Sequence, residues 1–94
     1  MTQSVQRWWV YLLECADHTL YTGVTTDLAR RVDQHNGMVA GGARYTRARR
    51  PVRLIWSEMC DCRSSAQRRE VAVRKLGRRQ KLALAQRADD EGGL

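Results

Sequence analysis

Hydrophobic residues gather in three short segments that have the length and composition of β-strands. Residues 8–15 (WWVYLLEC) are apolar on both alternating faces except at Glu14, which is typical of a strand inside a sheet. Residues 19–24 (TLYTGV) resume this composition after the short polar stretch ADH, so the two segments predict a β-hairpin. A third strand is predicted over residues 51–58 (PVRLIWSE), where apolar residues alternate with others.

The length of the hairpin loop decides which side chains share a face of the sheet. If residues 16–18 form the loop, Leu13 lies opposite Tyr21. Tyr11 then lies opposite Gly23, and the two tyrosines become diagonal neighbours on one face. A two-residue loop would place them on opposite faces, because a shift of one residue turns every side chain over. Both registers are compatible with the pattern of residues.

The first predicted helix follows the hairpin and carries two candidate functional side chains on one face. Thr26 or Asp27 is a suitable N-cap, and the later Asn-Gly dipeptide ends the helix. Arg31 and His35 are one turn apart and flank the apolar stripe, whereas Arg30 points to solvent. This spacing fits two groups aimed at one phosphate, and it fits equally an ordinary helix flank beside the core.

Two further helices are predicted in the last third of the chain. A capping box of Ser64 and Gln67 begins the first of them and Gly77 ends it, and the last helix is expected over residues 78–88. Residues 38–50 show no apolar periodicity and contain glycines and arginines, which predicts a mobile surface loop.

These elements predict one small α+β domain in the order β-β-α-β-α-α. We expect a three-stranded antiparallel or mixed sheet flanked by helices over residues 8–88. Residues 1–7 and 89–94 are expected to be flexible ends. A chain of 94 residues is long enough for only one modest core.

The charge of the chain limits the classes of molecule that it is expected to bind. Lysine and arginine number 17 against 10 acidic residues, and the formal net charge is +7. Such an excess of positive charge favours a polyanionic binding partner. Nucleic acid is the leading candidate, and an anionic membrane surface is a much weaker one. No apolar run approaches the roughly 20 residues that span a bilayer, and the start lacks a signal-peptide core, so we expect a cytoplasmic protein. No obligate protein partner is indicated.

An arginine cluster in residues 44–53 is the predicted nucleic-acid contact. Its sequence, RYTRARRPVR, contains no acid, and a loop so crowded with cations repels itself unless a polyanion neutralises it. It has no base-reading motif that separates DNA from RNA. The candidate contacts are Arg44, Arg47, Arg49, Arg50 and Arg53.

Glu70 is the acid with the least expected position. Helical winding places it between apolar side chains of the second predicted helix, on the face turned to the core. One interpretation is a structural ion pair, with Arg74 one turn on or with an arginine across the sheet. The other is a ligand for a hard metal ion, since Mg²⁺ and Mn²⁺ prefer carboxylate oxygen. The residues alone support both equally.

The tyrosines of the hairpin also allow two interpretations. Tyrosine in a strand is usually a half-buried aromatic residue whose hydroxyl finds a partner. Tyr21, however, is followed by Thr22-Gly23, and a glycine inside a strand often marks the close approach of a ligand.

The order of these features resembles the GIY-YIG family, most closely its small single-domain bacterial members. The resemblance extends from Trp8 to about Leu84. It is carried by Val10-Tyr11-Leu12, Tyr21-Thr22-Gly23, residues 27–32, His35-Asn36, residues 43–46, and Arg69-Glu70. It implies a metal-dependent phosphodiesterase fold that acts on DNA, related to homing, restriction and excision-repair nucleases. It also favours the three-residue hairpin loop, which brings both phenols to one face.

The resemblance implies a catalytic set formed by Tyr11, Tyr21, Arg31, His35 and Glu70. Glu70 would hold Mg²⁺ or Mn²⁺ at the scissile phosphate, and Arg31 would neutralise charge in the transition state. Either tyrosine would orient or deprotonate the attacking water with its pKa lowered by Arg31 and the metal, or His35 would be the base. The function implied is a DNA endonuclease of repair or processing, with DNA favoured over RNA.

A second hypothesis is a nucleic-acid-binding module that keeps the fold and the arginine-rich loop without catalysis. It is motivated by departures from the family pattern. The asparagine that many members carry after the glutamate has no clear equivalent, and no appended DNA-binding domain is present in these 94 residues.

Overall fold

The computed structural model describes the backbone of residues 7–92 and the side chains of residues 7–87. Three strands and four helices follow one another along the chain. They are β1 (Trp8–Glu14), β2 (Leu20–Thr25), α1 (Leu28–His35), α2 (Arg44–Arg47), β3 (Arg53–Cys60), α3 (Arg63–Arg74) and α4 (Arg78–Gly92). The expected α+β class is confirmed.

The sheet has the strand order β2-β1-β3, and both strand pairs are antiparallel. The prediction that the first strand is interior is therefore confirmed. Leu13 pairs with Tyr21 and Tyr11 pairs with Gly23, which is the register of the three-residue loop. Tyr11 and Tyr21 consequently share one face of the sheet. An irregularity in the pairing of β1 with β3 lies between Leu12 and Leu13.

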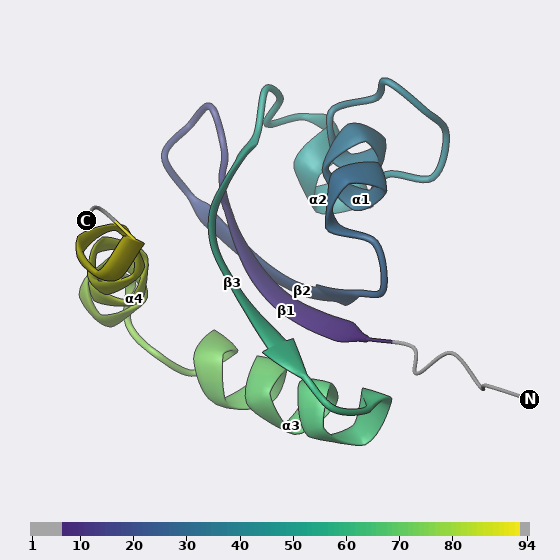
Figure 1. Ribbon diagram of the computed structural model, residues 1–94. Helices are drawn as coiled ribbons and strands as arrows, with labels where there is room; N and C mark the ends of the chain where they lie inside the picture. Colours follow the sequence, from purple (N-terminus) through teal and green to yellow (C-terminus); the bar gives the residue numbers. More distant parts are fainter. Residues whose placement is uncertain (1–6, 93–94) are drawn as a thin grey trace, which may run out of the picture.

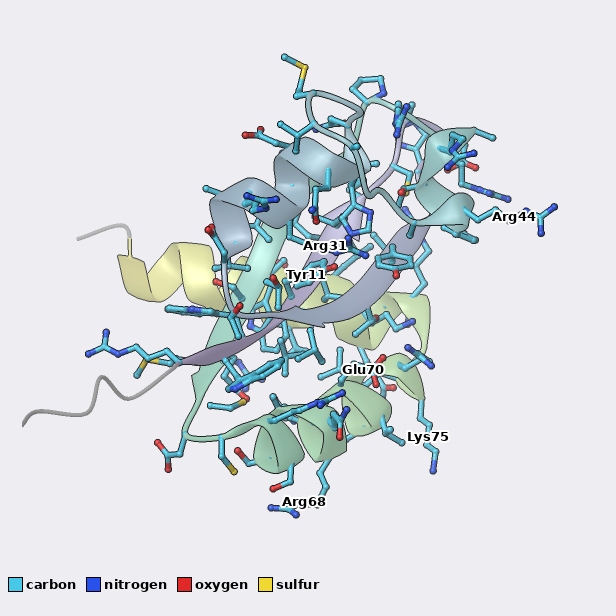
Figure 2. All side chains as sticks on the ribbon, turned by 90° about the vertical axis from the view of Figure 1, so that its right-hand side faces the viewer. Tyr11, Arg31, Arg44, Arg68, Glu70 and Lys75 are labelled. Carbon is cyan, nitrogen blue, oxygen red and sulfur yellow. The ribbon has the colours of Figure 1, made fainter. Side chains whose placement is uncertain are left out.

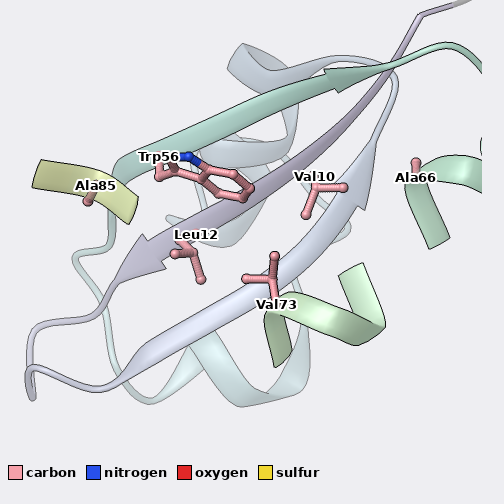
Figure 3. Packing of buried hydrophobic residues seen from close by; sticks show 6 residues of the cluster. All are labelled: Val10, Leu12, Trp56, Ala66, Val73 and Ala85. Carbon is pink, nitrogen blue, oxygen red and sulfur yellow. The ribbon is translucent and has the colours of Figure 1, made fainter. Parts of the chain in front are cut away.

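Helices cover both faces of the sheet, which explains why β1 is apolar on both sides. In Figure 1, α3 and α4 lie on one side of the strands and α1 and α2 on the other. The larger core, shown in Figure 3, lies between the sheet and α3 with α4; it comprises Val10, Leu12, Trp56, Ala66, Val73 and Ala85. The second core, on the α1 side, comprises Tyr11, Leu13, Cys15 and Val52.

The helix boundaries differ from the predicted ones. Asp27 caps α1 by accepting a hydrogen bond from the Arg30 amide, as the sequence suggested. The cap of α3 is Cys62 rather than Ser64: its backbone is extended where the helix begins, and its N–H donates to Ser65 Oγ at 3.3 Å in a capping box. Cysteine is an unusual cap, and the usual cap preferences pointed to the serine two residues later.

Two predicted irregular segments are partly helical. The expected loop over residues 38–50 contains the short helix α2, whose single turn is too short to show a hydrophobic period. Residues 89–92 continue α4 rather than beginning a tail, since no glycine or proline interrupts the sequence before Gly92. The remainder of the expected flexible ends, residues 1–6 and 93–94, lies outside the described residues. Within the described range, no helix is both long and apolar enough to cross a membrane.

Candidate active site

Four aromatic rings pack together on the α1 side of the sheet. The ring centroid of Tyr21 lies 5.0 Å from that of His35, 5.8 Å from that of Tyr45 and 6.4 Å from that of Tyr11. Gly23 completes this cluster by having no side chain, because a Cβ at this position would overlap the Tyr11 hydroxyl. The glycine that the sequence singled out is therefore needed for the placement of a tyrosine.

A buried hydrogen-bond chain joins this cluster to α2. The Tyr11 hydroxyl lies 2.8 Å from His35 Nε2, and His35 Nδ1 lies 2.8 Å from Thr46 Oγ1. Thr46 Oγ1 in turn donates to the Ala43 carbonyl at 3.0 Å. Tyr11 is 1% exposed and His35 is fully buried. His35, expected at the flank of α1, thus lies inside the protein and meets no solvent.

Burial keeps both members of the Tyr11–His35 pair neutral near pH 7. Burial, with the guanidinium groups of Arg31 and Arg50 acting in the same direction, lowers the pKa of His35 to about 4. Burial also raises the pKa of Tyr11 to about 12. A hydrogen-bond contact with Arg31 lowers the pKa of Tyr11, as expected from the sequence. The effect of burial is larger, so the pKa is raised overall.

The depressed pKa of His35 predicts a loss of stability in mild acid. The unfolded chain binds a proton at His35 near pH 6.5, whereas the folded chain does so only near pH 4. The free energy of unfolding should therefore fall by about 3 kcal/mol as the pH is lowered through this window. Urea unfolding at pH 7, 6, 5 and 4 measures this fall, and His35→Gln should remove it. The matched control is His18→Gln, whose side chain is 81% exposed and which should keep the wild-type slope.

Arg31 lies beside the ring cluster and anchors the segment after α1. Its Nη1 donates to the Gly41 carbonyl at 2.8 Å and to Gln34 Oε1 at 2.9 Å. The guanidinium is half-buried and contacts the Tyr11 hydroxyl, while the adjacent Arg30 is exposed. The helical period alone had predicted this difference, with Arg31 beside the core and Arg30 in solvent. Several N–H groups of Arg31 remain for a further partner, because a guanidinium carries five.

Glu70 lies on α3 and is 9% exposed. Its Oε1 accepts a hydrogen bond from Arg74, so the ion pair that was one interpretation of this acid is present. Its Oε2 has no hydrogen-bond partner among the groups that the structure describes. The carboxylate is close enough to contribute to the raised pKa of Tyr11. Figure 2 shows Glu70 on the α3 side of the edge strand β2, with Tyr11 and Arg31 on the α1 side, along the same side of the molecule.

Two arginines of the predicted nucleic-acid cluster are paired with acids. Arg49 Nε donates to Asp17 Oδ2 at 3.0 Å, and its guanidinium lies 3.9 Å from the ring centroid of Tyr45. Arg53 donates to Glu14 Oε1 through Nε and Nη2, at 3.1 and 2.7 Å. These two arginines therefore also have acidic partners within the fold, because the acids of the β1–β2 hairpin are distant in sequence but adjacent in space.

A third member of the cluster is tied to the backbone, and the other two make no side-chain hydrogen bond to a described group. Arg50 Nε donates to the His35 carbonyl at 2.7 Å. Arg44 and Arg47, on α2, are exposed and make no side-chain hydrogen bond to a group that the structure describes. In Figure 2, Arg44 extends away from the protein. The cluster thus divides into three internally bonded arginines and two available ones.

The α3 helix adds cations that the sequence reasoning did not assign to nucleic acid. Arg68 on α3 and Lys75, which caps the C-terminus of this helix, are exposed and lie seven positions apart, in the same direction around the helix axis. In Figure 2 Arg68 points away from the sheet, on the opposite face of α3 from Glu70, and Lys75 extends outward beyond the end of the helix. They were missed because each looks like an ordinary solvated charge until the fold places α3 beside the candidate site.

Comparison with known proteins identifies the family. Residues 7–83 match the family described as the GIY-YIG catalytic domain. The chain belongs to the GIY-YIG family. It is 51% identical to a UPF0213 protein of Desulfotalea psychrophila, over 90% of this chain and 76% of that protein. It is 52% identical to a UPF0213 protein of Halobacterium salinarum, over 80% of this chain and 95% of that one.

Solved structures agree with this membership. The solution NMR structure of a UPF0213 protein from Bacillus halodurans is 41% identical and superposes with a TM-score of 0.53, covering 85% of this chain and 83% of that chain. A protein of E. faecalis, also solved by NMR, is 37% identical with a TM-score of 0.54 and the same coverage. The resemblance seen in the motifs is thereby confirmed for the whole domain.

The residues of this GIY-YIG domain fit a divalent metal ion held by a single carboxylate. Among the described residues, no three histidine, cysteine, aspartate or glutamate side chains gather to form a closed metal site. Glu70 is nevertheless a buried carboxylate with one oxygen that accepts no described hydrogen bond. Mg²⁺ and Mn²⁺ are commonly bound by one or two carboxylates with phosphate and water in the remaining positions.

Sequence reasoning gave no role to Thr46 or Tyr45 of this domain. Both lie in the segment Ala-Arg-Tyr-Thr, which carried part of the family resemblance, but a four-residue helix gives no period that would show which side chain faces the site. Thr46 is fully buried against His35, and Tyr45 stacks on Tyr21.

Proposed function

We propose that this GIY-YIG domain is a divalent-metal-dependent endonuclease that hydrolyses phosphodiester bonds in DNA. One observation carries the proposal. Two tyrosines, a histidine, an arginine and a buried glutamate gather around the edge strand β2. These residues are Tyr11, Tyr21, Arg31, His35 and Glu70. The proposal extends to a cytoplasmic protein of DNA repair or processing, a part that rests on the family resemblance alone.

Arg31 and Glu70 receive the two charged roles. The N–H groups of Arg31 that are free of Gly41 and Gln34 donate to the scissile phosphate and stabilise the charge that develops there. Glu70 would hold Mg²⁺ or Mn²⁺ through its carboxylate. When bound, this ion supplies Lewis-acid polarisation of a phosphoryl oxygen. Arg74 then keeps the other carboxylate oxygen in place.

Tyr21 is the residue that we assign to the attacking water. Its ring is held between His35 and Tyr45, and its hydroxyl makes no hydrogen bond to a described group. The hydroxyl of Tyr11, by contrast, is buried against His35, and both of these side chains are neutral. Tyr11 and His35 therefore support the site from behind, while Tyr21 presents a hydroxyl that orients water.

Exposed cations on two helices flank this site and suit a nucleic-acid backbone. Arg44 and Arg47 are exposed on α2, Arg68 is exposed on α3, and Lys75 is exposed at the C-terminal cap of α3. Figure 2 shows Tyr11, Arg31 and Glu70 between the labelled cations Arg44 and Lys75. A strand bound along this side would place phosphates on both sides of the scissile one.

Neutralising the α2 cations should weaken nucleic-acid binding and its salt dependence. For the double variant Arg44→Gln/Arg47→Gln, we expect the slope of log K against log[salt] to become shallower by about 1 to 2, because one or two phosphate contacts are lost. Fluorescence anisotropy of a labelled single-stranded oligonucleotide between 50 and 200 mM salt measures the slope. The matched control is Arg79→Gln/Arg87→Gln on α4, which removes two exposed cations elsewhere. An equal change in the control would mean that net charge alone governs binding.

The activity itself is tested on several polyanions in parallel. Supercoiled plasmid, branched DNA and single-stranded RNA are incubated with the protein in Mn²⁺, in Mg²⁺ and in EDTA. We expect cleavage of DNA in the presence of metal and none in EDTA. Salt-dependent binding to these polyanions without cleavage in any condition would reject the endonuclease and favour a nucleic-acid-binding module.

A further inference from the structure

The positions of the hydrogens in the buried hydrogen-bond chain from Tyr11 to α2 can be assigned by starting at the Ala43 carbonyl. The Ala43 carbonyl can only accept, and Thr46 Oγ1 donates to it at 3.0 Å. A threonine hydroxyl has one hydrogen, which this bond uses. The contact between Thr46 Oγ1 and His35 Nδ1, at 2.8 Å, therefore requires the hydrogen to be on the imidazole. His35 Nδ1 is the donor to Thr46.

The outer half of the chain follows from the neutral state of His35. A neutral imidazole carries one N–H, and this one is at Nδ1. His35 Nε2 is then an acceptor, so the Tyr11 hydroxyl, 2.8 Å away, donates to it. All three hydrogen bonds run in one direction, from Tyr11 through His35 and Thr46 to the Ala43 carbonyl. Hydrogen bonds in such a chain polarise one another in the same sense.

The direction of the chain matters because of what Tyr11 presents to the site. With its hydrogen committed to His35, the Tyr11 oxygen faces the Arg31 guanidinium only as an acceptor, and Arg31 can only donate. In the opposite direction the Tyr11 oxygen would accept from His35, and the Tyr11 hydroxyl could face the Arg31 guanidinium with its hydrogen as well as with its oxygen. The Arg31 guanidinium would then be oriented by its bonds to Gly41 and Gln34 alone.

We propose that Thr46 is a positioning residue of the GIY-YIG site, which fixes the His35 tautomer and, through Tyr11, the orientation of Arg31. Thr46 touches neither the substrate nor the reacting atoms in this role. It is fully buried, and α2 holds its hydroxyl against the Ala43 carbonyl. The consequence for cleavage rests on the proposed function, whereas the tautomer of His35 does not.

The test uses the full chain with Thr46→Val, which keeps the shape of threonine without the hydroxyl, and Thr46→Ser, which keeps the hydroxyl. Long-range ¹H–¹⁵N NMR correlations of the histidine ring, recorded at pH 7, show which nitrogen carries the hydrogen. We expect the Nδ1–H form for His35 in the wild type and in Thr46→Ser. In Thr46→Val we expect a shift to Nε2–H or to a mixture. The exposed His18 is the internal reference in every spectrum.

Cleavage kinetics supply the second readout. We expect kcat of Thr46→Val to fall about 10- to 100-fold with little change in KM, because Arg31 acts on transition-state charge. Thr46→Ser should stay within about threefold of the wild type. An Nε2–H tautomer in the wild type, or an unchanged Nδ1–H tautomer in Thr46→Val, would overturn the proposal. The wild-type spectrum decides the direction of the chain even if Thr46→Val does not fold, and an inactive wild type with the Nδ1–H tautomer would reject the endonuclease alone.

Discussion

Replacing Glu70 with glutamine should reduce metal-dependent cleavage of DNA by on the order of 10³-fold and leave the fold intact. Glutamine has nearly the shape of glutamate, and its amide oxygen can still accept a hydrogen bond from Arg74, so the buried position remains satisfied. It loses the negative charge that a divalent ion requires. The measurement is single-turnover cleavage of a labelled DNA in Mn²⁺, with circular dichroism as the check of folding.

The matched control for this variant is Glu58→Gln. Glu58 Oε2 also accepts a hydrogen bond from an arginine, Arg69 Nε, at 2.8 Å, but its side chain is 41% exposed. We expect this variant to cleave DNA at close to the wild-type rate. Undiminished cleavage by Glu70→Gln would place the metal elsewhere or reveal a contaminating nuclease, and equal losses in both variants would remove the special role of Glu70.

Replacing Arg31 with lysine should lower the cleavage rate by about 10²- to 10³-fold. Lysine keeps the charge, but its ammonium cannot reproduce the planar arrangement of donors by which Arg31 binds Gly41 and Gln34 and is proposed to hold a phosphate as well. Loss of the bond to the Gly41 carbonyl should also reduce stability by about 1 kcal/mol. Single-turnover rates at saturating DNA separate the catalytic effect from weaker binding.

The adjacent Arg30 offers the control for Arg31. Arg30→Lys makes the same chemical change one residue earlier on α1, where the side chain is exposed. We expect cleavage by Arg30→Lys to match the wild type. If both lysine variants retained full activity, Arg31 would be limited to holding the segment after α1.

The parts of the fold that depend on local periodicity could be predicted from the sequence. The interior position of β1 followed from its two apolar faces, and the hairpin followed from the polar ADH stretch. Helical winding placed Arg30 in solvent and turned Glu70 inward, because both statements need only the 100° step of a helix. The register of the hairpin required the family resemblance, since residues alone allowed two loops.

What could not be predicted depends on contacts between segments distant in the sequence. Asp17 and Glu14 neutralise Arg49 and Arg53 from 32 and 39 positions away. His35 is buried because α2 closes over it, and α2 shows no periodic pattern of its own. Our proposal of Tyr21 rather than Tyr11 for the attacking water could not be made from the sequence either, because it depends on which hydroxyl the fold buries.

The most direct test of the account is whether one divalent ion binds where these residues meet. Addition of Mn²⁺ to ¹⁵N-labelled protein should broaden the backbone amide signals of Gly23, Arg31 and Glu70 first, because a paramagnetic ion relaxes nearby nuclei. The same titration of Glu70→Gln should leave these three signals sharp, and that of Glu58→Gln should repeat the wild-type result. Broadening that begins elsewhere in the chain, or that persists at these amides in Glu70→Gln, would contradict a metal site at Glu70.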